Sequence, residues 1–139
     1  MKDAVVVAIA LVWDEQRLLV TQRPAGTHLA GRWEFPGGKV EAFETPEACA
    51  EREVLEEVGL RVAARSRLTP IRHAYVERDV TLHPVECSLL GGELRLLGVS
   101  DARWVLPHEL ATLTFPEANR PLIAELIARA ESSNRSRAR

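Results

Sequence analysis

Glu53, Glu56 and Glu57 are spaced so that, on a helix, their three carboxylates share one face. Neighbouring Cβ atoms at this spacing lie about 5–6 Å apart. With an effective dielectric constant of about 20, each like-charged pair at that distance costs roughly 3 kcal/mol before screening. Magnesium would offset this repulsion, because it is a hard cation that shares its coordination shell between carboxylates, waters and phosphates. An acidic, solvated helix face is the alternative interpretation of these residues.

The segment around these glutamates carries the start and stop signals of a helix over residues 46–58. Thr45 is a favourable N-cap, Pro46 suits the first helical position, and Glu47 complements the dipole of the first turn. Gly59 is typical of the position just after a helix. The apolar stripe expected to face the core is Ala50, Val54 and Val58, with Ala48 and Leu55 beside it and Glu51, unexplained, within it.

A longer pattern surrounds the three glutamates: G-x5-E-x7-R-E-U-x-E-E-x-G-U, in which U is an aliphatic residue. With average residue frequencies, the chance of such a match is below roughly 10⁻⁸ per window. The pattern is the Nudix box, so the chain resembles the Nudix hydrolases. The matching residues are Gly38, Glu44, Arg52, Glu53, Val54, Glu56, Glu57, Gly59 and Leu60.

Two features of the box have roles that follow from their residue types. Gly37 and Gly38 let the backbone turn sharply and approach a metal or a phosphate closely. Arg52 can hold a carboxylate through two parallel hydrogen bonds, and Glu44 is its expected partner. This pair would fix the loop that precedes the helix against the helix itself.

The resemblance extends over most of the chain and is closest to the MutT branch of the family. The matching stretches are VTQRPAGTHLAGRWEFPGGK, YVERDVTL, RWV and FPEANRPLIAEL. This resemblance implies an α/β/α sandwich, with a mixed β-sheet and the helix of the Nudix box packed against it. It also implies magnesium-dependent hydrolysis of nucleoside triphosphates to the monophosphate and pyrophosphate, with Mn²⁺ as a substitute metal. The name-giving members of the branch act on 8-oxo-dGTP.

By the same resemblance, the Gly38 carbonyl and the carboxylates of Glu53, Glu56 and Glu57 would be metal ligands. Water would attack a phosphorus atom, expected to be the β one, while the metals neutralise charge on the phosphate oxygens. Glu53 is the first candidate for the base that activates this water, and Glu44 and Arg52 would support it.

One position departs from the MutT branch, which often carries a further glutamate before the RWV segment. Gly98 stands at that position, and Asp101 is the nearest carboxylate. The number of metals and the identity of the general base therefore stay open.

Seven residues are candidates for binding the nucleotide. Lys39 and Arg23 would hold phosphate oxygens, although Lys39 is equally well interpreted as a surface lysine. The amide of Asn119 can donate and accept together, which suits a purine edge, and its alternative role is the N-cap of a C-terminal helix. The others are Phe35 and Tyr75 as walls of a base pocket, His28 in a flanking loop, and Arg78 in the segment expected to close over the base. A core role for Phe35 and a solvated loop position for His28 are the alternatives.

The remaining elements follow from local patterns. Residues 4–12 predict a central strand, and a turn at 14–16 followed by a strand at 17–23 completes a hairpin. A loop is expected at 24–31, a short strand broken at 36–38, and helices at 107–113 and 117–130. Further strands are expected at 60–64, 68–76, 80–90 and 102–106, with turns at 77–79 and 91–92. The pattern indicates one mixed α/β domain over 1–132, followed by a basic, disordered tail over 133–139.

The composition is that of an ordinary globular protein, with 46% hydrophobic residues, 27% charged residues and a net charge of −2. The near-neutral charge argues against a general nucleic-acid binder. Cys49 and Cys87 lack metal-ligand spacing, which favours a reduced, cytoplasmic protein. The apolar run near the N-terminus is too short to span a bilayer, so no membrane association is expected. A monomer and a homodimer both fit the sequence.

Two alternatives to an 8-oxo-dGTP hydrolase stay open. Another Nudix substrate, such as CTP, methylated dCTP or a dinucleoside polyphosphate, would use the same carboxylates. A non-catalytic module that recognises oxidised guanine belongs to a different class, but such modules generally lack the glutamates that this chain retains.

Overall fold

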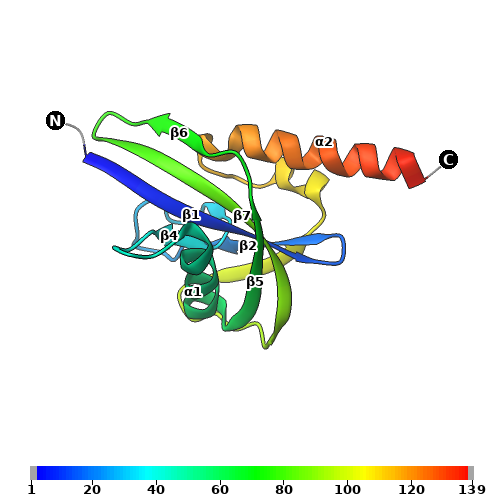
Figure 1. Ribbon diagram of the computed structural model, residues 1–139, viewed down its shortest axis with the longest axis horizontal. Coiled ribbons are helices and arrows are strands. Elements are labelled where there is room, and N and C mark those ends of the chain that lie inside the picture. The colour runs from blue at the N-terminus through cyan, green and yellow to red at the C-terminus, as the bar shows by residue number, and fades with distance from the viewer. Residues whose placement is uncertain (1–2, 138–139) are drawn as a thin grey trace.

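The computed structural model describes residues 3–137 and consists of a mixed β-sheet with a helix on each side (Figure 1). Strand β1 (Asp3–Asp14) lies at the centre, parallel to β7 (Arg78–Gly92) and joined by a tight turn to antiparallel β2 (Arg17–Gln22). The other strands are β3 (Trp33–Glu34), β4 (Gly37–Lys39), β5 (Leu60–Arg67), β6 (Ile71–Ala74) and β8 (Asp101–Val105). The helices are α1 (Pro46–Val58) and α2 (Arg120–Arg137), with 3₁₀ turns at Pro107–Thr112 and Glu117–Asn119.

Two apolar cores lie on opposite faces of the sheet, because successive side chains of a strand point to opposite sides. Ala10 and Val12 of β1 pack in the core beneath α1, whereas Ile9 and Leu11 pack in the core that contains Leu122 and Leu126 of α2. Burial on both faces accounts for the unbroken apolar run that marks β1 in the sequence. The α/β/α sandwich with a mixed sheet is therefore confirmed.

Helix α1 has the predicted bounds and caps. The Thr45 hydroxyl accepts a hydrogen bond from the Ala48 amide at 3.1 Å, and Gly59 ends the helix with a φ of 74°. Ala50, Val54 and Val58 are buried as predicted.

The edges of the predicted stripe on α1 differ from the expectation. Ala48 and Leu55 are exposed, and Cys49 is buried in their place, because the sheet lies under the line through residues 50, 54 and 58.

Glu51 has a structural role, since its carboxylate accepts a hydrogen bond from the Ala64 amide at 2.9 Å, where β5 bulges. The glutamate thus bonds to the backbone where the ladder between β5 and β7 is irregular.

Four other expectations are corrected. Residues 91–92 continue β7 and pair with Leu60 and Arg61 instead of forming a turn. The strand expected at 68–76 is limited to β6, and the turn lies at 75–77, before β7 begins at residue 78. Residues 37–38 form a strand with β1 instead of breaking one. Residues 133–137, assigned to a disordered tail, continue α2, and residues 138–139 lie outside the described part of the chain.

Between residues 3 and 137, no helix combines the length and apolarity that crossing a bilayer requires.

Candidate active site

Strand β4 lies between β1 and the carboxylates of α1, and its two glycines leave room for close approach on both sides. A Cβ on Gly37 would overlap the carbonyl oxygen of Ala8 and lie 2.9 Å from the Ile9 Cα. A Cβ on Gly38 would lie 2.5 Å from Glu53 Oε1. The two glycines thus have different functions: Gly37 permits pairing of β4 with β1, and Gly38 leaves room for the Glu53 carboxylate.

Glu57 and Glu53 face this glycine strand. The Gly37 amide donates a hydrogen bond to Glu57 Oε2 at 3.0 Å. Burial raises the pKa of the Glu57 carboxyl to about 8, and the nearby charges of Glu53 and Glu34 add to this effect, while the Gly37 amide opposes it. Burial also raises the pKa of Glu53, against the lowering effect of Arg52. Two crowded carboxyl groups therefore border the backbone of β4.

Arg52 links the loop, the helix and β4. Its guanidinium donates to both oxygens of Glu44, at 2.7 and 3.0 Å, which confirms the predicted pair. Hydrogen bonds from Arg52 hold the pKa of Glu44 near 2, so this carboxylate stays ionised. Arg52 also donates to Glu53 at 3.0 Å, to Glu56 at 3.2 Å and to the Lys39 carbonyl at 3.3 Å. One guanidinium thus holds three of the box carboxylates in place.

The three glutamates of the metal hypothesis are not equivalent. The Glu56 side chain is 57% exposed and bonded to Arg52, whereas Glu53 and Glu57 face the glycine strand. Within the described residues, no three His, Cys, Asp or Glu side chains form a ready-made metal-binding group. Glu53 and Glu57 are the carboxylates best placed to hold a cation.

Successive peptide groups of β4 point alternately toward β1 and away from it. Hydrogen bonds from Ala10 to the Pro36 carbonyl and from Val40 to the Val6 carbonyl flank the Ala8–Gly38 pair. The carbonyl of Gly38 therefore faces Ala8 across the ladder, and it also lies 3.5 Å from the thiol of Cys49. The expected metal ligand Gly38 is thus engaged within the protein, while the amide of Gly37 faces the carboxylates.

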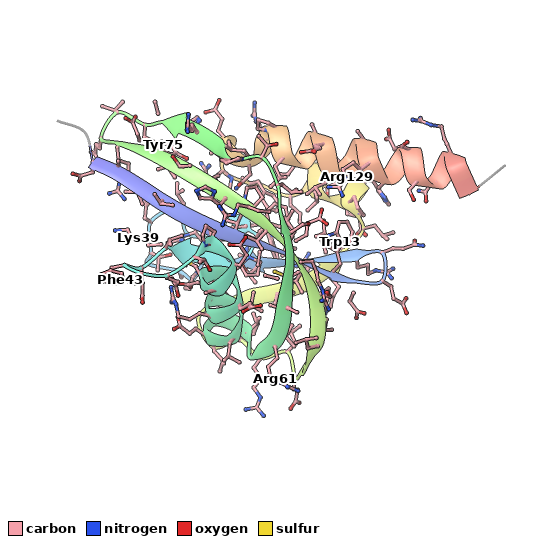
Figure 2. The ribbon with its side chains drawn as sticks, viewed as in Figure 1. Trp13, Lys39, Phe43, Arg61, Tyr75 and Arg129 are labelled. Atoms are coloured by element: carbon pink, nitrogen blue, oxygen red, sulfur yellow. The ribbon has the colours of Figure 1, made fainter. Side chains whose placement is uncertain are left out.

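A cavity of about 280 Å³ opens on the other side of β4. It is bordered by five of the predicted nucleotide-binding residues: Arg23, Phe35, Lys39, Tyr75 and Asn119. Figure 2 shows Lys39 and Tyr75 at the same end of the sheet. Phe35 borders the cavity, but it is also buried and packs on Phe115, with ring centroids 5.1 Å apart. It therefore belongs both to the cavity wall and to the core.

Asn119 is buried, and its side-chain oxygen has no hydrogen-bond partner among the described residues. An N-cap would accept a backbone N–H through this oxygen, so the capping alternative is wrong. A buried amide oxygen without a partner is costly unless a ligand satisfies it. Asn119 is therefore ready to accept a hydrogen bond from a group inside the cavity.

Two predicted residues, His28 and Arg78, do not border the cavity, and both side chains are exposed. His28 contributes its carbonyl, which accepts a hydrogen bond from Arg23 Nε at 2.6 Å and so orients that arginine. Arg78 contributes its carbonyl to the Tyr75 amide at 2.8 Å, which closes the β6–β7 hairpin.

Glu34 is a site residue that the sequence analysis missed. It borders the cavity, lies 3.5 Å from Arg23, and has its pKa raised by burial. A glutamate between two buried aromatic residues, Trp33 and Phe35, was the available signal.

Asp101, considered as a substitute ligand, instead bonds to Arg103 and to the Ala102 amide. Gly98 lies beside Glu57, where an added Cβ would meet only ordinary contacts of 3.7 Å or more.

A larger cavity, of about 540 Å³, lies between the β1–β2 hairpin and α2. Trp13 and Arg129 border it, and Figure 2 shows both at the opposite end of the sheet from Lys39. None of the predicted site residues borders this cavity. The smaller cavity is therefore the one connected with the carboxylates, through Gly37 and Gly38.

Comparisons with known proteins bear on this arrangement. The NUDIX domain family matches residues 7–125. The chain belongs to the Nudix family. The 8-oxo-dGTP diphosphatase of Escherichia coli (strain K12) is 33% identical to this Nudix chain over 121 residues, which cover 86% of the chain and 94% of the relative. The CTP pyrophosphohydrolase of the same strain is 30% identical over 128 residues, or 92% and 94%.

The fold of this Nudix hydrolase also agrees with solved structures. The crystal structure of the MutT protein from Methanosarcina mazei Go1 has a TM-score of 0.81, at 22% identity. The match covers 93% of this chain and 96% of that one. The family match and the 33% identity to an 8-oxo-dGTP diphosphatase make the protein a MutT-like Nudix hydrolase, and the solved structure agrees in fold.

Proposed function

We propose that this Nudix hydrolase is a magnesium-dependent pyrophosphohydrolase of nucleoside triphosphates, with 8-oxo-dGTP as its principal substrate. One observation carries the proposal: Gly37 and Gly38 border the cavity and also contact Glu57 and Glu53. A nucleotide with its base in the cavity would therefore extend its phosphates along β4 to the carboxylates.

The residues beside β4 fit a hard divalent cation. Glu53 and Glu57 offer carboxylate oxygens beside the Gly37–Gly38 backbone, and Glu56 is linked to Glu53 through Arg52. Oxygen donors of this kind are what Mg²⁺ and Mn²⁺ prefer. When bound, such an ion would neutralise charge on phosphate oxygens and favour ionisation of a water.

The residues of the chain then have distinct tasks in the reaction, in which water and a triphosphate give a monophosphate and pyrophosphate. Glu53 would accept the proton of the attacking water, because its carboxylate lies beside β4, along which the phosphates would extend. Arg52 would hold Glu53 in place, because it is itself fixed by Glu44. Lys39 and Arg23, at the edge of the cavity, would hold phosphate oxygens.

The base preference rests on Asn119. Its free oxygen would accept from an N–H of the base, while its NH₂ group would donate to an acceptor such as the 8-oxo or 6-oxo group. The 8-oxo-dGTP diphosphatase among the relatives supports this choice. CTP is the second candidate, because the CTP pyrophosphohydrolase matches nearly the whole chain at a similar identity.

The test is a screen with Mg²⁺ that measures pyrophosphate release from 8-oxo-dGTP, dGTP, CTP and methylated dCTP, and nucleotide products from a dinucleoside polyphosphate. We expect the highest kcat/KM for 8-oxo-dGTP, with its monophosphate as the second product. A preference for CTP would move the proposal to the second candidate, and no pyrophosphate from any substrate would contradict both.

A further inference from the structure

Cys49 lies on the side of α1 that packs against β4, and it has no role in the proposed chemistry. Its side chain is completely buried. The sulfur lies 3.5 Å from the carbonyl oxygen of Gly38 and 3.4 Å from that of Lys39. Burial raises the pKa of the thiol to about 11, so the sulfur keeps its single proton, which the two carbonyls can share.

The same thiol touches the guanidinium that organises the carboxylates. Arg52 Nη2 lies 3.7 Å from the Cys49 sulfur and 3.3 Å from the Lys39 carbonyl. The thiol and the guanidinium therefore converge on one carbonyl at the end of β4. Arg52 in turn bonds to Glu53, so a shift of β4 relative to α1 would disturb that carboxylate.

We propose that Cys49 is a positioning residue, which holds the backbone of Gly38 and Lys39 against α1 and so sets where β4 lies relative to Glu53 and Glu57. Its catalytic consequence rests on the proposed function, whereas its effect on the backbone does not. A side chain that only filled space at this position would need volume but no hydrogen to donate.

Cys87 provides a matched control within the same chain. It is also buried and unbridged, but its sulfur lies 3.5 Å from the carbonyl of Val85, two residues away on the same strand. Among the described residues, the hydrogen bond of this thiol therefore stays within β7. Replacing either cysteine by alanine removes the same atom from a buried site, and only one replacement releases β4.

The first measurement is amide hydrogen exchange by NMR, without metal, on the wild type and on Cys49→Ala, Cys49→Ser and Cys87→Ala. The reporter is the Gly37 amide, which bonds to Glu57. We expect exchange at Gly37 to be about fivefold faster in Cys49→Ala, as for the loss of one typical hydrogen bond, and unchanged in Cys87→Ala. Serine can still donate, so Cys49→Ser should be intermediate.

The second measurement is the Mg²⁺ concentration that gives half-maximal pyrophosphate release. We expect it to rise about fivefold in Cys49→Ala, with a smaller change in kcat, and to stay at the wild-type value in Cys87→Ala. Equal effects of the two alanine variants on Gly37 exchange, or a serine variant no better than alanine, would overturn the positioning role. If the wild type released no pyrophosphate at all, the proposed function would fail, and the exchange measurement would still decide the role of Cys49.

Discussion

The two glycines of β4 should respond very differently to the addition of one methyl group. In Gly38→Ala the new Cβ would lie 2.5 Å from Glu53 Oε1, at the end of a flexible side chain. An ordinary contact begins at 3.4 Å, so the carboxylate must retreat by about 1 Å. Displacement of a reacting group by about 1 Å can lower a rate by about 100-fold. We therefore expect kcat to fall by roughly that factor, with little loss of stability.

Gly37→Ala is the matched control, because its Cβ would overlap the backbone of β1 at Ala8 and Ile9, which cannot move aside. Overpacking of this kind typically costs about 1–3 kcal/mol. Urea unfolding of both variants, combined with pyrophosphate release by the folded protein, separates the two effects. Normal turnover in Gly38→Ala, or a loss of stability equal to that of Gly37→Ala, would contradict the close packing of Glu53 on β4.

Three further perturbations have definite expected outcomes. Glu57→Gln should lower kcat by at least about 100-fold, and Glu56→Gln by clearly less, because Glu57 bonds to the Gly37 amide of β4 whereas Glu56 is largely exposed; equal losses in steady-state rates would argue against this ranking. Asn119→Ala should reduce the preference for 8-oxo-dGTP over dGTP in kcat/KM more than it reduces total turnover, and an unchanged preference would remove Asn119 from base recognition. Without metal, the stability contributed by protonated Glu57 is present below its unfolded pKa of 4.5 and is lost as pH rises through about 8. The free energy of unfolding in EDTA should therefore fall by a few kcal/mol between these pH values, at about 1.4 kcal/mol per pKa unit, and a flat profile, or the same slope in Glu57→Gln, would contradict the assignment.

The sequence was sufficient for features that lie within one helix or one motif. The bounds and caps of α1 and the Arg52–Glu44 pair could be predicted because capping and bidentate pairing depend on residue types a few positions apart. The same spacing could not show that Glu56 turns toward Arg52 while Glu57 faces β4. That difference depends on which strand packs against the helix.

Residues from distant segments were harder to foresee. Glu34 joins the site because β3 brings it beside Arg23, and Cys49 joins it because the carbonyls of β4 lie over α1. The strand character of residues 91–92 likewise follows from pairing with β5, which outweighs the local preference of glycine for turns. Tertiary register, which short-range patterns do not encode, accounts for each of these differences.

The most direct test of the account is a crystal structure with Mg²⁺ and a slowly hydrolysed analogue of 8-oxo-dGTP. We expect metal density in contact with the oxygens of Glu53 and Glu57, the phosphates lying along Gly37 and Gly38, and the base bonded to Asn119. A nucleotide bound in the 540 Å³ cavity beside α2, with no ion at the two carboxylates, would contradict the account.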